Sequence, residues 1–419
     1  MKEQATKKRE NRTITVDIKD EATYYELCKN GKAFIEFIVA IIMSLGFQLK
    51  HKCGCQGGWR LTRHTNYVRV RLGDVPIWRV QCKDCRAVFT ILPQCVLRYS
   101  SLEPKEAKKA ILATQGGLSL EISATILDIS AMSIYRLVCA FGRISLVKVL
   151  SRCQLPLPQY ILADEKHSHC LRAKVYLTTI VVGRIIWHLG YTQNKTAQAF
   201  EKSYAQFQQA SQEIEADYQP KAILTDAFES TRKSLRKLFP TSKLGNCLMH
   251  ATHQVSTKLK AVSKSVRHSF SHQFYKLFEE RSENKTHKIR ALGQKLRRFT
   301  EKVTKLTGQE NGELIRQWIT RKKAGWYALF KDPNLPATST LLDQAHNSLD
   351  RKLFMMKGFH HKQGSQQHFL NALALFYNFI PYQRRAINAG KCGVQVEGGI
   401  LPTDDWFLNL QILTSAGFQ

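Results

Sequence analysis

The chain has 419 residues and carries 63 Lys and Arg against 33 Asp and Glu, a formal net charge of +30. A basic excess of this size indicates a polyanionic partner, and nucleic acid is the default one for a soluble chain; a merely solvated basic surface is the alternative. Aromatic residues make up 10% of the chain, which is typical of a globular protein and argues against disorder. The length suffices for two or three domains with sizeable cores.

The sequence shows no sign of secretion or of a membrane segment. Residues 1–12 are polar and contain no apolar stretch of the kind found in signal peptides. The most apolar segment, Ala33 to Phe47, contains Glu36 and is shorter than the roughly 18–20 residues of a membrane-spanning helix. The eleven cysteines are scattered along the chain, which favours a reducing compartment over a disulfide framework. We therefore expect a cytoplasmic protein.

The front half begins with a polar stretch, residues 1–19, for which we predict no element. A buried helical segment follows over residues 21–49, and short β-like runs lie between residues 50 and 98. Residues 103–142 predict three helical segments, with a break at Gly116 and Gly117. A linker with two prolines, residues 154–159, ends this half.

Two close cysteine pairs, Cys53 with Cys55 and Cys82 with Cys85, flank β-like sequence. Four thiolates on two turns suit a tetrahedral structural Zn²⁺ site, with Cys95 as a possible substitute ligand and unrelated buried cysteines as the alternative. We expect a zinc ribbon at residues 50–98. A ribbon of this size buries little apolar surface, so the metal would supply its folding energy.

The segment from Leu118 to Leu137 predicts a helix-turn-helix. Ser119 is positioned to cap one helix, and the turn from Asp128 leads into a second helix, 131–141, that Ser130 caps. In this motif the second helix enters the major groove of DNA. Residues near its N-terminus would then lie close to bases or phosphates: Ser133, Tyr135 and Arg136. The alternative is an ordinary helical hairpin.

The back half predicts three strands and then alternating helices and strands. The strands are expected at residues 160–166, 174–183, 185–192, 221–226 and 243–249, with helices at 196–215 and 228–239. Gly183 and Arg184 supply a hairpin turn between the second and third strands. This order is that of a ribonuclease-H-like fold. Residues 255–335 then become helical and rich in Lys and Arg, and helices resume at 341–357 and 365–389.

Three acidic residues stand at positions suited to metal-dependent chemistry. Asp164 and Asp226 each end an apolar, strand-like run, and Asp343 lies in the first turn of a predicted helix. Two Mg²⁺ ions about 3.5–4 Å apart, held by such carboxylates, are the machinery of phosphodiester cleavage. Glu165 should point to the opposite face of its strand and is not expected to be a ligand. The alternatives to Asp343 are Asp350 and Glu397, which fit the pattern less well.

The sequence resembles insertion-sequence transposases with a DDE-type catalytic core, similar to Mutator-like and related bacterial elements. The residues that carry the resemblance are the Asp164-Glu165 pair, Leu224-Thr-Asp226, Cys247-Leu-Met-His250, Gly325-Trp326-Tyr327 and the block from Thr338 to Lys352. The front half resembles the zinc-ribbon and helix-turn-helix domains attached to such transposases. The third acid of the family is usually Glu, and Asp343 stands at the matching place.

The resemblance implies a DNA transposase that binds its terminal inverted repeats and catalyses metal-dependent strand cleavage and transfer, as a dimer or larger assembly on DNA. Asp164, Asp226 and Asp343 would hold Mg²⁺ or Mn²⁺. Trp326 would stack on an unpaired base, with a core tryptophan as the alternative, and Cys247 with His250 would help to place the active-site helix or DNA. Basic runs, including Arg321, Lys322 and Lys323, would track phosphates. Such a protein would be associated with the bacterial nucleoid.

Together these patterns predict a multidomain α+β protein, with a zinc ribbon and helix-turn-helix before a ribonuclease-H-like α/β catalytic core that carries an all-helical insertion. The expected divisions are a tail and helix (1–49), the ribbon (50–98), the helix-turn-helix (99–150), the core (160–254), the insertion (255–336), the last part of the core (337–390) and a C-terminal extension (391–419). Two other functions remain open: a catalytically weak, transposase-derived DNA-binding regulator, and a nuclease that cuts without joining.

Overall fold

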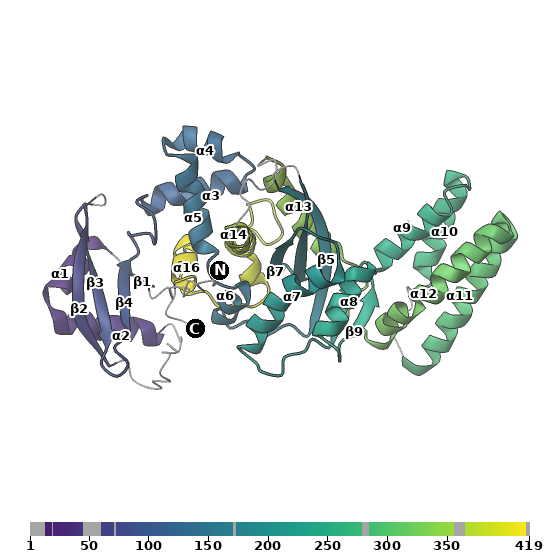
Figure 1. The fold of residues 1–419 in the computed structure, drawn as a ribbon, viewed down its shortest axis with the longest axis horizontal. Coiled ribbons are helices and arrows are strands. Elements are labelled where there is room, and N and C mark those ends of the chain that lie inside the picture. The colour runs from purple at the N-terminus through teal and green to yellow at the C-terminus, as the bar shows by residue number, and fades with distance from the viewer. Residues whose placement is uncertain are drawn as a thin grey trace, which may run out of the picture. The chain divides into compact units, whose positions relative to one another are not determined.

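The computed structural model describes residues 13–18, 20–44, 60–70, 73–170, 173–278, 285–355 and 365–415. The protein is a mixed α+β structure with two sheets, as the sequence predicted at this level (Figure 1). The chain forms two compact units: Met1–Leu155 with Leu349–Gln419, and Pro156–Ser348. Each unit is described separately below.

The sheet of the first unit has four strands in the order β1-β4-β3-β2. Strands β2, β3 and β4 form an antiparallel meander, and β1 runs parallel to β4. Their bounds are β1 Thr13–Val16, β2 Leu61–Arg69, β3 Val75–Cys82 and β4 Val88–Pro93. Strand β1 lies in the stretch for which the sequence predicted no element.

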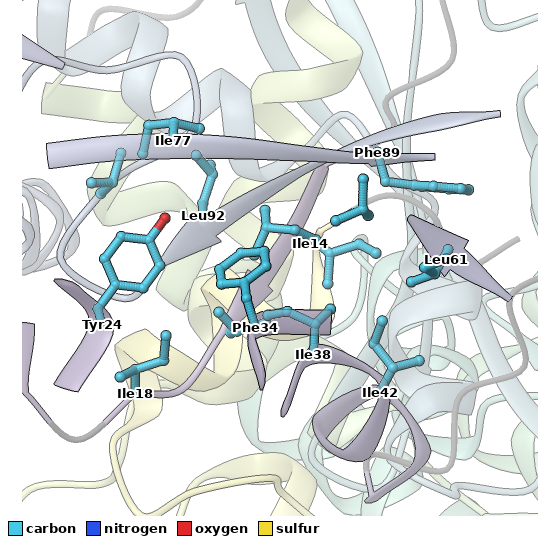
Figure 2. Packing of buried hydrophobic residues seen from close by; sticks show 14 of the residues in the cluster. Ile14, Ile18, Tyr24, Phe34, Ile38, Ile42, Leu61, Ile77, Phe89 and Leu92 are labelled. Carbon is cyan, nitrogen blue, oxygen red and sulfur yellow. The ribbon is translucent and has the colours of Figure 1, made fainter. Parts of the chain in front are cut away.

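Helices α1 (Glu21–Lys29) and α2 (Gly31–Ser44) share one apolar core with this sheet. Helix α2 buries Phe34, Ile38 and Ile42, which recur every four residues and therefore lie on one helical face. Figure 2 shows these side chains among residues of all four strands. The helices expected within 1–49 and the strands expected within 50–98 therefore share one core.

Three helices follow as the sequence predicted: α3 (Pro104–Gln115), α4 (Leu120–Leu127) and α5 (Ala131–Phe141). The Ser119 hydroxyl accepts a hydrogen bond from the Ile122 amide at 3.2 Å, and the Ser130 hydroxyl accepts one from the Ser133 amide at 3.0 Å. Asp128, in the left-handed conformation at φ 53°, ends α4 and opens the turn. Both predicted caps and the predicted turn are confirmed.

No single helix in the described ranges is long and apolar enough to cross a membrane. Helices α4 and α5 satisfy the criteria of length and composition only when taken together, and they are bent by 111° at the break between them.

The first unit also contains α6 (Leu146–Arg152) and three helices from the end of the chain, α14 (Gln366–Phe379), α15 (Gly393–Val396) and α16 (Trp406–Leu413). Helix α14 packs against α5 so closely that a Cβ on Gly142 would lie 1.7 Å from the carbonyl oxygen of His368. Residues 337–390 were expected to form the last part of the catalytic core. Of these, α14 lies in the first unit, where Phe376 contacts Phe141 of α5.

The second unit contains a five-stranded sheet in the order β7-β6-β5-β8-β9. Strands β5, β6 and β7 are antiparallel, whereas β8 and β9 run parallel to β5. Their bounds are β5 Tyr160–Cys170, β6 Ala173–Val182, β7 Ile185–Thr192, β8 Ala222–Thr225 and β9 Lys243–Asn246. Gly183, at φ 55°, forms the predicted hairpin turn between β6 and β7.

Helices α7 (Ala197–Gln212) and α8 (Glu229–Leu238) alternate with the last strands of this sheet, as expected. A run of helices follows β9: α9 (Leu248–Lys258), α10 (Lys264–Lys276), α11 (Lys285–Thr307) and α12 (Gln309–Lys331). Over the described part of 255–335 the chain has no strand, which agrees with the predicted helical insertion. Helix α13 (Thr340–Met355) comes next, and its first half belongs to the second unit.

Candidate functional site

Three carboxylates meet at one edge of the five-stranded sheet. Asp164, Glu165 and Asp226 each offer an oxygen atom, and these atoms all lie within 4.8 Å of one another. Strands β5 and β8 are parallel neighbours with Leu162 opposite Leu224, so residues two positions further along each strand emerge side by side. The predicted convergence of Asp164 and Asp226 is therefore confirmed.

Asp164 lies on the side of the sheet that α13 covers. In the antiparallel register it is opposite Thr179, and such partners point to the same face. The Thr179 hydroxyl is 3.0 Å from Nε2 of His346, a residue of α13. Asp164 is itself buried, and its Oδ1 accepts a hydrogen bond from the Glu165 amide at 2.8 Å.

Glu165 starts from the other side of the sheet. It is opposite Thr178, whose hydroxyl is 2.6 Å from the Ser203 hydroxyl of α7. The Glu165 carboxylate accepts a hydrogen bond from the hydroxyl of Thr231 on α8. The face of the strand from which the Glu165 side chain projects was thus predicted correctly. Its carboxylate nevertheless lies close to the other two acids. Alternation along a strand constrains the Cβ, whereas the end of a longer side chain has further freedom.

Asp226 begins a tight turn after β8. Its Oδ1 accepts a hydrogen bond from the Phe228 amide at 2.7 Å, and Ala227 between them has a positive φ of 75°. This Asx turn holds the carboxylate at the edge of the sheet and leads directly into α8.

Burial and mutual repulsion make this cluster unfavourable when it is fully ionised. Burial, followed by the charges of Asp226 and Glu165, holds the pKa of Asp164 well above its usual range. Burial and the Asp226 charge raise the pKa of Glu165 to about 7. A divalent cation would remove this repulsion, and three carboxylate oxygens from neighbouring segments are the hard donors that Mg²⁺ or Mn²⁺ prefers. The residues present therefore fit such an ion.

Asp343 lies in the first turn of α13, as predicted, but does not belong to this group of three. Its Oδ2 accepts a hydrogen bond from the Ser339 hydroxyl at 3.4 Å. That hydroxyl is also 3.5 Å from Nδ1 of His250. Of the three predicted ligands, Asp164 and Asp226 therefore lie together, and Glu165 joins them. The alternative acids Asp350 and Glu397 fall in the first unit.

Cys247 and His250 form a hydrogen-bonded pair beside the acids. Burial alone would raise the pKa of the Cys247 thiol, but hydrogen bonds with His250 and Ser339 outweigh this effect and lower it. The hydrogen bond to Cys247, together with the nearby charges of Asp164 and Asp226, raises the pKa of His250 to about 9. The raised pKa favours the imidazolium form of His250, whose positive charge partly balances the carboxylates.

The residues predicted to read DNA differ in their accessibility. Ser133 is occupied by the α5 cap, where its hydroxyl is 2.8 Å from that of Ser130. Tyr135 is partly buried: its hydroxyl is 2.7 Å from that of Ser365, and its ring stacks on Phe369 of α14 at 5.4 Å. Arg136 is exposed.

The predicted contacts of α12 are also revised. Arg321 and Lys323 are exposed, whereas the Lys322 ammonium donates a hydrogen bond to the Ala227 carbonyl at 2.8 Å. Trp326 is 1% exposed and is a core residue, which was the alternative to base stacking. Its ring lies 5.0 Å from that of Trp318 and 5.3 Å from that of Phe274, so no base can reach it in this arrangement.

Of the proposed zinc ligands, Cys82 ends β3 and Cys85 lies in the following turn, and their thiols are close enough to share a hydrogen bond. Cys53 and Cys55 lie outside the described residues. Cys95, the possible substitute, lies beside Glu21 of α1; burial and that carboxylate raise its pKa to about 11.

No family model and no curated protein matches the sequence. The chemistry of the acidic cluster and the topology that forms it are therefore the basis for inferring a function.

Proposed function

We propose that the protein is a DNA transposase of the DDE type, which binds the inverted repeats of its insertion sequence and cuts and joins DNA with divalent metal ions. The observation that carries the proposal is the cluster of Asp164, Glu165 and Asp226 within 4.8 Å at one edge of the sheet. Metal-dependent phosphodiester chemistry needs such a convergence of oxygen ligands.

The strand order β7-β6-β5-β8-β9 supports this proposal. Three antiparallel strands followed by two strands parallel to the first is the order expected of a ribonuclease-H-like fold. The helices α10 to α12, between β9 and α13, correspond to the insertion that the resemblance to transposases implies.

In the proposed mechanism Asp164, Glu165 and Asp226 would hold divalent metal ions, which would supply activation of the attacking oxygen and stabilisation of the departing one. The Thr231 hydroxyl orients Glu165, and the turn at Ala227 orients Asp226. His250 contributes a positive charge beside the ligands, and Ser339 links it to Asp343. In this proposal Asp343 contacts the site through its hydrogen bond with Ser339, and Asp164, Glu165 and Asp226 would be the metal ligands.

DNA recognition in this proposal belongs to the basic surface and to α4 and α5. The formal charge of +30 and the capped helix pair with its 111° bend are the supporting observations. Arg136 is the exposed cation near the start of α5. A structural Zn²⁺ held by Cys82, Cys85, Cys53 and Cys55 remains part of the proposal. Metal analysis should then find about one zinc per chain, lost in the Cys82→Ser/Cys85→Ser variant.

The test is strand cleavage and joining on a duplex that carries the inverted repeats flanking the gene, with Mg²⁺ or Mn²⁺. Wild-type protein should cut and join, and Asp226→Asn should lose cleavage while still binding the DNA ends. Specific binding without cutting would favour the regulator, and cutting without joining would favour the nuclease. Undiminished cleavage by Asp226→Asn would overturn the catalytic assignment.

A further inference from the structure

Lys322 connects the helical insertion to the turn that carries Asp226. Its ammonium group donates a hydrogen bond to the Ala227 carbonyl at 2.8 Å. Its own backbone carbonyl accepts one from Nδ2 of Asn246 at 2.8 Å. One residue of α12 is thus tied to the ends of both β8 and β9.

The contact around Asn246 is tightly packed. The Arg232 guanidinium of α8 donates to Oδ1 of Asn246 at 2.5 Å, so both ends of the amide are used. Gly325 lies one helical turn after Lys322, and a Cβ there would be 2.4 Å from the Asn246 side chain. A side chain at position 325 would force either α12 or the Asn246 side chain to move, so Gly325 permits the close approach that brings Lys322 to Asn246.

The turn that Lys322 contacts is strained. Ala227 has φ 75°, in the left-handed region that a residue with a Cβ seldom adopts. The ammonium on the Ala227 carbonyl opposes relaxation of this turn, and the same turn sets the direction of the Asp226 carboxylate.

The charges are consistent with this role. Lys322 is half-buried; burial and the neighbouring Arg232 lower its pKa, while Glu229 and Asp226 act in the opposite direction. The neighbouring cations Arg321 and Lys323 are more accessible to solvent than Lys322, since both are exposed.

We propose that Lys322 is a positioning residue that couples the basic helical insertion to the acidic cluster, by holding the turn from Asp226 to Phe228 in its metal-binding form. The inference deepens the proposed function and rests on it for the DNA step. In this proposal Lys322 stabilises the turn that carries the metal ligand Asp226. The exposed residues Arg321 and Lys323 contact the DNA phosphates instead.

The test compares Lys322→Met and Lys322→Arg with Lys323→Met in the full-length chain. Mn²⁺ affinity is measured by calorimetry without DNA, DNA affinity by titration of the end duplex, and the cleavage rate in single turnover at saturating DNA. Loss of such an outer contact typically reduces metal affinity or activity about 10–100-fold. We expect that loss for Lys322→Met with DNA affinity unchanged, partial recovery in Lys322→Arg, and weakened DNA affinity alone in Lys323→Met.

Two results would overturn the coupling: wild-type Mn²⁺ affinity and cleavage rate in Lys322→Met, or a loss of DNA affinity there that matches Lys323→Met. A circular dichroism melt of each variant separates a positioning defect from unfolding, and the Lys322→Arg variant provides a folded comparison. If wild-type protein binds Mn²⁺ but cuts no DNA, the proposed function fails, whereas the Mn²⁺ measurements on Lys322→Met still decide the positioning role.

Discussion

The two sheets differ in the kind of side chain that they bury. The sheet of the first unit closes over a core of apolar side chains from β1 to β4, α1 and α2 (Figure 2). The edge of the second sheet buries or half-buries three carboxylates beside one another. Burial of apolar groups is favourable by itself, at roughly 25 cal/mol per Å², whereas burial of like charges is unfavourable unless a cation joins them. The first arrangement is therefore stabilised by the burial itself, and the second is suited to binding a cation.

The polar groups in the two regions show the same contrast. Tyr24, buried in the first core, donates its hydroxyl to the Pro76 carbonyl at 2.6 Å, so that its polar atom has a partner within the fold. Glu165 has the Thr231 hydroxyl, but it still faces two other acids. Unfavourable charge retained at one place is a common mark of a functional site.

The largest effect is expected from a cavity in the first core. Phe34→Ala removes a fully buried ring and should lower the free energy of unfolding of the first unit by about 3–5 kcal/mol. Met43→Ala on the same helix is the matched control: its side chain is 66% exposed, and the change should stay within about 0.5 kcal/mol. Denaturant titration followed by tryptophan fluorescence measures both, and equal effects would contradict the assignment of this core.

The cluster of Asp164, Glu165 and Asp226 should make the stability of the second unit depend on Mn²⁺. Mn²⁺ at about 100 times its dissociation constant should stabilise the folded second unit by about 2.7 kcal/mol. Glu165→Gln should abolish most of this gain, and in metal-free protein it should be stabilising, because it removes a buried carboxylate with a raised pKa. Asp343→Asn is the control and should keep the response; calorimetric scans with and without Mn²⁺ measure all three. Loss of the response in Asp343→Asn alone would restore Asp343 as the third ligand.

Local patterns in the sequence were enough to predict the strands of the second sheet and two of its acids. Asp164 and Asp226 were found because each ends an apolar run, and parallel neighbours bring such ends together. Glu165 was missed because alternation along a strand describes where the Cβ points and not where a longer side chain ends. Asp343 was placed correctly at the start of a helix, but sequence does not determine how that helix is rotated about its axis.

The first unit was harder to predict because its organisation depends on distant pairings. Strand β1 has four residues and pairs in parallel with β4, whose register places Ile14 opposite Ile91. A strand this short carries little pattern of its own. The cysteine pairs suggested a ribbon stabilised by metal, while the apolar faces of α2 and β3 gave no local indication that they pack together.

A buried histidine in the second sheet should make that unit sensitive to acid. His188 lies on β7, 3.1 Å from the Thr178 hydroxyl, and burial lowers its pKa to about 3. Below pH about 6.5 this histidine binds a proton in the unfolded chain but stays neutral in the folded chain. The free energy of unfolding therefore decreases as pH falls below that value, by up to about 1.4 kcal/mol per pH unit. His188→Gln should reduce this slope and His253→Gln, an exposed control, should not. Unfolding titrations between pH 7 and pH 5 measure the difference, and an unchanged slope in His188→Gln would exclude this residue as the cause.

The smallest effect is expected at Trp326, where the core and DNA-stacking interpretations diverge. Among the described residues its buried indole Nε1 has no hydrogen-bond partner, so Trp326→Phe removes an unsatisfied donor as well as part of a ring. These two changes oppose each other: loss of the unsatisfied donor favours the variant by about 1–3 kcal/mol, and the cavity left by the smaller ring disfavours it. We expect a net change near 1 kcal/mol and unaltered DNA affinity, measured by thermal unfolding and by titration with single-stranded and duplex DNA. A loss of DNA affinity with unchanged stability would mean that the helical insertion opens and exposes this ring to DNA. Trp326 would then be a DNA-binding residue and not only a core residue.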